Sequence, residues 1–320
     1  MSNPLKQPLI FMILAALAGG VWVGLRYPAF VTGHPQISLA ALIGIFFLSS
    51  LTIDMASVLR AAKDIRTVGL AAIFTLFVLP LAIYTATAPF SPTLALSFLI
   101  LAAMPAGMTA PLLAELAGGE KNTALVVTVA TSLLAPLTVP FVISLAAGQS
   151  VHVDSMAMFL RLGQVIIIPF TAAQIVRIAL NNHLSRIAHV FTPVSTFLLG
   201  ILILFIVAKR PHEIASLVSG GGALRELLAI CLFFILLHII GYMVYFKKAP
   251  ADRVALTVCM AYVNFTLAVD LADKFFSAYP GVVLPVVLSV IPWALLFIPF
   301  RAFTRHVHTT NPIRTTSSHG

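Results

Sequence analysis

The chain has 320 residues, of which 60% are hydrophobic and only 9% are charged, and its mean hydropathy is +1.05. Soluble domains are about 45 to 50% apolar and about 25% charged. A water-soluble fold of this length would lack the polar side chains needed to cover its surface. The composition therefore predicts a membrane protein and excludes a soluble enzyme.

The formal net charge of +9 comes from 19 Lys and Arg residues against 10 Asp and Glu residues. In a soluble chain this excess would suggest a nucleic-acid partner, but here the basic residues lie between hydrophobic segments. That position is typical of residues that set membrane topology and contact lipid headgroups, so we expect the lipid bilayer, and no nucleic acid, as partner. Neither the two cysteines nor any histidine pair has metal-ligand spacing, so no metal site is expected.

Apolar runs of about 20 residues, the length that crosses about 30 Å of hydrocarbon, recur ten times. They lie near residues 8–26, 37–57, 67–87, 92–117, 123–147, 156–178, 190–208, 226–246, 253–275 and 281–304. If both termini are cytoplasmic, thirteen of the 19 basic residues fall on the inner side and six on the outer. This asymmetry predicts a multi-pass plasma (inner) membrane protein with both ends inside.

The domain prediction is one transmembrane transporter domain over residues 1–305, followed by a disordered cytoplasmic tail over 306–320. No long polar insertion and no GxxxxGK[ST] loop is present, so ATP-driven transport is not expected. No nucleophile motif supports hydrolysis either, and the chain is not expected to be an enzyme. The sequence predicts no particular oligomeric state.

The ten segments divide into two sets of five, about 8–147 and about 156–304, as in transporters built from inverted repeats. Because five is odd, the second set would be reversed in the membrane. Two pairs of landmarks share an offset of 156 residues: Gly44 with Gly200, and Pro136 with Pro292. The same offset places the fourth segment opposite the ninth.

The fourth segment carries helix-breaking prolines, and the ninth carries a lone Asn with a nearby Thr at the matching depth, with no Gly or Pro to enforce a break. In the fourth, Pro105 and Pro111 each remove a backbone donor, so the helix must break between them. Backbone polar groups freed at membrane depth are tolerated only where they are buried in protein or line a polar cavity, which favours a binding site. The alternatives are a structural kink at the prolines and an interhelical hydrogen bond at Asn264. The candidate substrate residues at the two breaks are Pro105, Gly107, Thr109, Pro111, Asn264 and Thr266.

The order and spacing of these features resemble a bacterial member of the bile acid sodium symporter family. The resemblance covers Phe47–Pro80, Met104–Pro140 and Ala255–Ala268, which contain a basic loop, a Pro- and Gly-rich break and a second break. It implies ten helices in two inverted five-helix repeats. Spans one, two, six and seven would form a panel domain and the others a core domain, with spans four and nine crossing at unwound centres near the membrane midplane. Members of the family carry organic anions with sodium.

Several ion-site positions of the family have different residues here. Its Ser-Asn pair after the first break falls on Ala110 and Pro111, its acidic residue on Cys259 and its Gln in span three on Thr75. A sodium ion is held by about six hard oxygens, so the resemblance implies at best one altered site. Its candidate residues are Thr75, Thr128, Thr131, Ser132, Cys259 and Asn264.

Two intramembrane acids offer another means of coupling. Glu115 follows the first break and Asp270 the second. Because burying an ionisable group inside a span is costly, such a group suggests a function such as carrying protons. The alternative is structural, with Glu115 at the interface beside Lys121 and Asp270 paired with Lys274 one turn on.

The sequence thus predicts a secondary transporter of a small organic anion, with Na⁺ as the expected coupling ion and alternating access as the mechanism. A proton-coupled or uncoupled carrier of the same fold is one alternative. A membrane-embedded receptor that binds a ligand without transporting it is another.

Overall fold

The computed structural model describes residue 15 and residues 18–61, 65–148, 151, 153–212, 222–279 and 281–310. Within these ranges the regular elements are all helices, apart from an isolated antiparallel bridge between Ala106 and Val263. The helices are α2 (Pro28–Gly33), α3 (Gln36–Leu51), α4 (Met55–Ala61), α5 (Ile65–Ile73), η1 (Phe74–Val78), α6 (Leu79–Thr87), α7 (Pro92–Ala103), α8 (Ala110–Leu116), α9 (Lys121–Ala147), α10 (Ser155–Leu162), η2 (Gly163–Ile167), α11 (Ile168–Ala208), α13 (Gly222–Val244), α14 (Pro250–Ala261), α15 (Phe265–Phe275), α16 (Val283–Leu288), α17 (Val290–Leu295) and α18 (Phe297–Thr310).

Six helical stretches of the described chain are long and apolar enough to cross a membrane, judged by length and composition. They are Arg66–Thr87, Lys121–Ala147, Ser155–Leu180, Ile187–Ala208, Leu224–Val244 and Val283–His306. Two shorter apolar helices, α3 and α7, lie where the second and fourth spans were expected. The prediction of a helical, multi-pass membrane protein is therefore confirmed.

The ends of the chain only partly fall within the described residues. The predicted first span begins at residue 8, and of it residues 15 and 18–26 are described and helical. At the other end, α18 continues to Thr310, into the predicted tail, whose residues 311–320 lie outside the described part.

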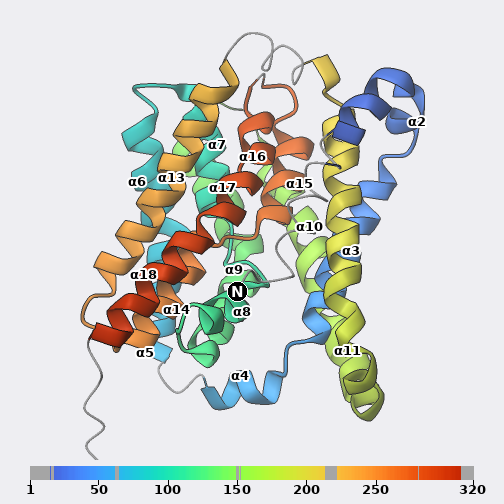
Figure 1. Ribbon diagram of the computed structural model, residues 1–320. Coiled ribbons are helices and arrows are strands. Elements are labelled where there is room, and N and C mark those ends of the chain that lie inside the picture. Colours follow the sequence, from blue (N-terminus) through green and yellow to red (C-terminus); the bar gives the residue numbers. More distant parts are fainter. Residues whose placement is uncertain are drawn as a thin grey trace, which may run out of the picture.

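Two groups of helices flank a buried centre (Figure 1). On one side α3 packs along α11, and residues 18–26 pack against the end of α11 so closely that a Cβ on Gly24 would lie 2.1 Å from the Ala208 carbonyl oxygen. α11 bends at Leu180, where the backbone leaves helical geometry (φ −120°, ψ 20°), so the predicted sixth and seventh spans are joined by helical residues. On the other side lie α13, α14 and α18, and α9 and α15 lie between the two sides (Figure 1).

Two π-helical turns, η1 and η2, each lead directly to a proline, Pro80 or Pro169, in the second position of the next helix. A proline has no N–H to donate and clashes with the carbonyl one turn earlier, and a widened turn relieves both problems without ending the helix. Thr75, inside η1, is buried at 3% exposure. The π turn thus places a hydroxyl in the core.

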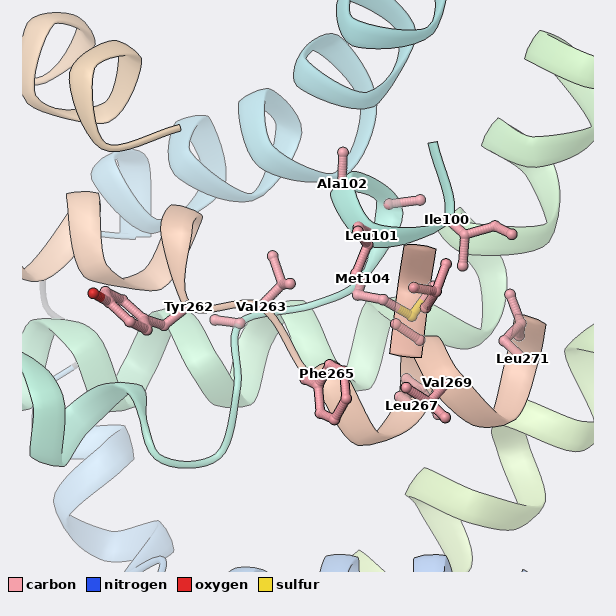
Figure 2. Close-up of a cluster of buried hydrophobic side chains, with 14 of the residues drawn as sticks. Ile100, Leu101, Ala102, Met104, Tyr262, Val263, Phe265, Leu267, Val269 and Leu271 are labelled. Atoms are coloured by element: carbon pink, nitrogen blue, oxygen red, sulfur yellow. The ribbon is translucent and has the colours of Figure 1, made fainter. Parts of the chain in front are cut away.

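The centre of the molecule is formed by the helices around the two breaks. Side chains from the end of α7 lie against α15, with Leu101 and Met104 facing Leu267 and Val269 (Figure 2). All four are at most 1% exposed. This apolar packing fixes both broken helices relative to each other.

Candidate functional site

The two interrupted helices meet at their breaks. The N–H of Gly107 donates to the carbonyl of Tyr262, and the N–H of Asn264 donates to the carbonyl of Pro105, both at 2.8 Å. The chains run antiparallel through this contact, and each break supplies one donor and one acceptor that its own helix does not use. Backbone groups inside a bilayer must be satisfied within the protein, and here one break satisfies the other.

Gly107 is required by the closeness of this contact. A Cβ at this position would lie 2.8 Å from the Tyr262 carbonyl oxygen and 3.1 Å from that of Val263. Both obstacles are backbone atoms, which cannot rotate away as a side chain does. A glycine therefore allows the two breaks to approach within hydrogen-bond distance.

The second break occurs without a glycine or proline because Asn264 caps the helix that follows it. The Oδ1 atom of Asn264 accepts hydrogen bonds from the N–H of Leu267 at 3.2 Å and from the hydroxyl of Thr266 at 2.8 Å. An N-cap residue leaves helical geometry while satisfying a free donor of the next turn, so it ends one helix and starts another. Asn264 is 5% exposed, and its oxygen has a structural role.

Two of the predicted substrate residues lie at the start of α8. Thr109 is the N-cap residue and is exposed, and its side chain makes no capping hydrogen bond. Pro111 is the second residue of α8 and is buried, a position where a helix tolerates proline because no N–H is needed there. One exposed hydroxyl, that of Thr109, therefore lies beside the first break.

Helix α9 lies behind the crossing and bonds to it through Thr131. The hydroxyl of Thr131 accepts a hydrogen bond from the N–H of Ala106 at 3.2 Å and donates to the carbonyl of Val127 at 2.8 Å. Its side chain is fully buried. Thr131 thus holds the first break against α9.

Three buried hydroxyls near this helix have no hydrogen-bond partner among the described residues: those of Thr128, Ser132 and Tyr245. Thr128 lies beside the thiol of Cys259, which contacts the carbonyl of Ala124 at 3.5 Å. Buried polar groups are nearly always hydrogen-bonded, so several unsatisfied groups need an explanation such as a bound ion or water.

The structure brings three of the predicted cation residues, Thr75, Thr128 and Cys259, near one another. Cys259 lies beside Thr128 on α9, and Thr75 lies beside the hydroxyl of Tyr245, whose own surroundings include Cys259. Ser132 follows Thr128 by four residues, on the same face of α9. Thr131 and Asn264 instead use their side-chain oxygens to hold the breaks.

The two candidate acids have different surroundings. Glu115 forms an ion pair with Lys121 at 2.7 Å, and both side chains are about half exposed, at 52% and 55%. Asp270 is buried, and its partner is Arg161 from α10, which contacts both carboxylate oxygens at 2.6 and 3.0 Å. The structure thus places Glu115 beside Lys121, as the structural alternative expected, whereas Asp270 pairs with Arg161 and not with Lys274.

A second ion-pair group lies one turn along α15. Asp273 accepts hydrogen bonds from Lys209 at 2.5 Å and from Arg210 at 2.7 Å, at the end of α11. With the Arg161 pair, this contact ties α15 to both α10 and α11.

Two tyrosines at the site were not among the predicted site residues. Tyr262 supplies a carbonyl to the crossing, and its hydroxyl lies 3.1 Å from Nε2 of His238 on α13. Tyr245 lies beyond the end of α13 and turns a buried hydroxyl toward Thr75. The available signal was a tyrosine hydroxyl in or at the end of an apolar run, because polar groups in membrane helices form buried polar contacts.

A helical membrane protein whose two interrupted helices pair at buried breaks has a construction that is common in membrane transporters. The model of the sodium bile acid symporter family matches residues 39–217, more than half of the chain. The chain therefore belongs to the sodium bile acid symporter family, whose members are transporters and not enzymes. The family resemblance of the sequence is confirmed.

Two vertebrate relatives are similar to this chain over most of their length. They are sodium/bile acid cotransporter 7 of Xenopus tropicalis and sodium/bile acid cotransporter 7-B of Xenopus laevis. Each is 24% identical over 259 residues, which cover 77% of this chain and 75% of the relative.

Proposed function

We propose that this protein is a secondary active transporter that carries a small organic anion together with Na⁺ by alternating access. The observation that carries the proposal is the reciprocal hydrogen bonding of the two breaks, through Gly107 and Asn264. Broken helices that meet inside a bilayer are the common construction of transporter binding sites. The relatives named as sodium/bile acid cotransporters support the same substrate class.

The proposed architecture has ten spans in two inverted repeats, about 8–147 and 156–304. Residues 18–26, α3, α10 and α11 would form the panel, and the remaining helices the core with the crossing. The tight packing of α3 on α11 and the antiparallel pairing of Ala106 with Val263 support this division. In the proposed orientation both termini are cytoplasmic, in a plasma membrane.

The anion is proposed to bind beside the crossing. The first turn of α15 begins at the second break, and the unpaired amides of a helix start carry partial positive charge. The exposed Thr109 offers a hydroxyl to a carboxylate or sulfonate, whereas the partly exposed Thr266 already donates its hydroxyl hydrogen to Asn264. A saturable counterflow of a labelled bile acid in proteoliposomes tests transport directly, and a receptor that only binds would show no counterflow.

The sodium site is proposed among Thr75, Thr128, Ser132, Cys259 and Tyr245. The buried hydroxyls of Thr128, Ser132 and Tyr245, which have no partner among the described residues, are hard oxygen donors, the type of ligand a sodium ion requires. A thiol stands where the family has a carboxylate, so affinity is expected to be lower than with a charged ligand.

The first test is the unfolding temperature of the detergent-purified protein in Na⁺ against K⁺ or choline, across pH. A ligand that binds only the folded state stabilises it by about 2.7 kcal/mol at a hundredfold excess over Kd. A sodium-specific rise that saturates supports the site. If the unfolding temperature does not respond to sodium but shifts with pH, the proton-coupled alternative replaces the proposed sodium site.

Alternating access requires that panel and core move relative to each other. Both ion pairs of α15, those of Asp270 and Asp273, join it to the proposed panel helices α10 and α11. We propose that these contacts close one end of the transporter and separate when that end opens.

The proton-coupled alternative assigns coupling to Asp270 or Glu115. The observation that favours this alternative is the buried carboxylate of Asp270, which lies in a predicted span and pairs with Arg161. Asp270→Asn should then abolish pH-driven uptake, and unchanged uptake would eliminate Asp270 as the coupling group.

A further inference from the structure

His238 is a partly buried histidine on α13 whose ring contacts the residue at the second break. Its Nδ1 atom lies 2.7 Å from the carbonyl oxygen of Phe234, one turn earlier on the same helix. Its Nε2 atom lies 3.1 Å from the hydroxyl oxygen of Tyr262. The ring of Phe300, on α18, packs against it with 4.8 Å between the ring centres. His238 therefore connects α13 to the residue at which α14 ends.

The partners of the two ring nitrogens assign the hydrogen of this imidazole. A carbonyl oxygen accepts hydrogen bonds and cannot donate them, so Nδ1 carries the hydrogen that binds Phe234. In the neutral imidazole Nε2 is then an acceptor, and the hydroxyl of Tyr262 donates to it. The contact with Phe234 thus turns an acceptor toward Tyr262.

The side chain of Tyr262 is enclosed on several sides. It is 1% exposed, and its ring points away from Met104 (Figure 2). The rings of Trp293 and Phe297 meet it edge to face, with 5.7 and 5.6 Å between ring centres. A buried tyrosine hydroxyl usually has a hydrogen-bond partner, and His238 supplies one here. Both the ring and the hydroxyl of Tyr262 are therefore held in place.

The main chain of Tyr262 forms part of the crossing. The residue leaves helical geometry (φ −101°, ψ 65°), and its carbonyl accepts the hydrogen bond of the Gly107 N–H at 2.8 Å. A carbonyl at the end of a helix has no partner in its own helix, so its direction depends on what else holds the residue. The enclosed side chain of Tyr262 can fix that direction.

Gly241 allows α13 to approach α14 closely beside this contact. It lies three residues after His238, and a Cβ at Gly241 would lie 3.1 Å from the Cα of Thr257 in α14. Residues three apart lie on the same side of a helix, so Gly241 and His238 both face α14. Close backbone packing at small residues is typical of membrane helices, and here it keeps His238 within reach of Tyr262.

We propose that His238 is a positioning residue of the crossing. By accepting the hydrogen bond of the Tyr262 hydroxyl, it keeps the Tyr262 carbonyl at the place where the Gly107 N–H binds. His238 acts through Tyr262 and does not need to contact the transported anion. Its consequence for transport rests on the proposed function, whereas its consequence for the crossing does not.

The first test is amide hydrogen exchange of the purified protein in detergent, followed at the Gly107 N–H. His238→Leu removes the acceptor, and Tyr262→Phe removes the donor but keeps the ring. We expect each variant to speed exchange at Gly107 about tenfold, which corresponds to a loss of about 1.4 kcal/mol. The double variant should be no faster than either single variant. Effects that multiply in the double variant, or unchanged exchange, would overturn the proposal.

His238→Gln is the conservative variant, because its Oε1 atom can accept the hydroxyl hydrogen of Tyr262. We expect it to restore slow exchange at Gly107 and, in proteoliposomes, most of the counterflow rate that His238→Leu loses. A loss that came only from altered packing would not be rescued by this polar side chain. If His238→Gln behaves as His238→Leu does, the hydrogen bond is not the cause and the proposal is wrong.

His34→Leu is the matched control. The Nδ1 atom of His34 lies 2.9 Å from the carbonyl of Phe30, also four residues earlier, but His34 is exposed at the end of α2. Its removal should change neither exchange at Gly107 nor counterflow, and an effect equal to that of His238→Leu would contradict the proposal.

Two further points keep the outcomes distinct. Tyr262→Phe tests the same hydrogen bond from the other side if His238→Leu does not fold. If the unaltered protein shows no counterflow, the proposed function fails, whereas exchange at Gly107 still decides whether His238 positions the crossing.

Discussion

The side chain of Arg161 holds the carboxylate of Asp270 at two points, 2.6 and 3.0 Å away, across 109 residues of sequence. Both side chains are largely buried, at 15% and 7% exposure. A two-point contact between a guanidinium and a carboxylate is short and directional, so it fixes the orientation of α15 relative to α10. It is also costly to break on one side only, because the remaining charge stays buried.

We therefore predict that Asp270→Asn destabilises the protein by about 3 to 5 kcal/mol, whereas the double variant Arg161→Met with Asp270→Leu loses much less. Chemical unfolding in detergent measures both. Glu115→Gln is the control: its pair with Lys121 is half exposed, and loss of an exposed pair costs about 1 kcal/mol or less. If the double variant were as unstable as Asp270→Asn, the buried charge would not be the cause.

Gly107→Ala should disrupt the crossing of the two helices. Its Cβ would lie 2.8 Å from the Tyr262 carbonyl oxygen, so the backbones must separate and the hydrogen bonds between the breaks lengthen. We expect a cost of about 1 to 3 kcal/mol and loss of most transport in proteoliposomes.

Gly69→Ala is the matched control for this substitution. Gly69 lies inside α5, and a Cβ there would meet nothing within 4 Å. Alanine is the better helix former by about 0.5 to 1 kcal/mol, so Gly69→Ala should be neutral or stabilising and transport unchanged. Equal losses in both variants would argue against the close contact as the reason.

Thr128→Val and Ser132→Ala test the proposed sodium site. Removing a buried hydroxyl that has no partner should leave stability in K⁺ unchanged or slightly higher, because no hydrogen bond is lost. The rise in unfolding temperature on adding Na⁺ should disappear in each. Thr138→Val is the control on the same helix, since its hydroxyl bonds only to the carbonyl of Leu134 and should not affect the sodium response.

Thr131→Val should behave in the opposite way. Its hydroxyl accepts the hydrogen bond of the Ala106 N–H, so valine leaves a buried donor unsatisfied. A lost partner of this kind costs about 1 to 3 kcal/mol, in Na⁺ and K⁺ alike. A purely sodium-dependent loss would instead make Thr131 an ion ligand.

Much of the fold followed from the sequence because a bilayer imposes strong local rules. Long apolar runs have to be helices, since every backbone group must find a partner inside the segment. The first break was predicted from Pro105 and Pro111 by the same reasoning, and α7 indeed ends at Ala103 and α8 begins at Ala110. The second break depends on Asn264, which caps α15. An Asn can also lie within a continuous helix, so its presence in the sequence did not by itself predict a break.

The partners of individual side chains were decided by tertiary structure. Sequence spacing offered Lys274 to Asp270, one turn away on the same helix, but the packing of α10 on the core brings Arg161 to it. Likewise, Thr131 and Thr128 lie three residues apart with the same type of side chain, yet one holds the first break and the other has no hydrogen-bond partner in the described part of the chain.

The sequence by itself determined the membrane environment, the helical class, the first interruption and the family, because these depend on composition, proline chemistry and residue order. Only the tertiary structure decided that the two breaks bond to each other, that Asp270 pairs with Arg161 and that the buried hydroxyl of Thr128, beside Cys259, finds no partner among the described residues. The physical reason is that hydrogen bonds and ion pairs act over about 3 Å. Such contacts depend on how distant helices pack, which local sequence patterns do not specify.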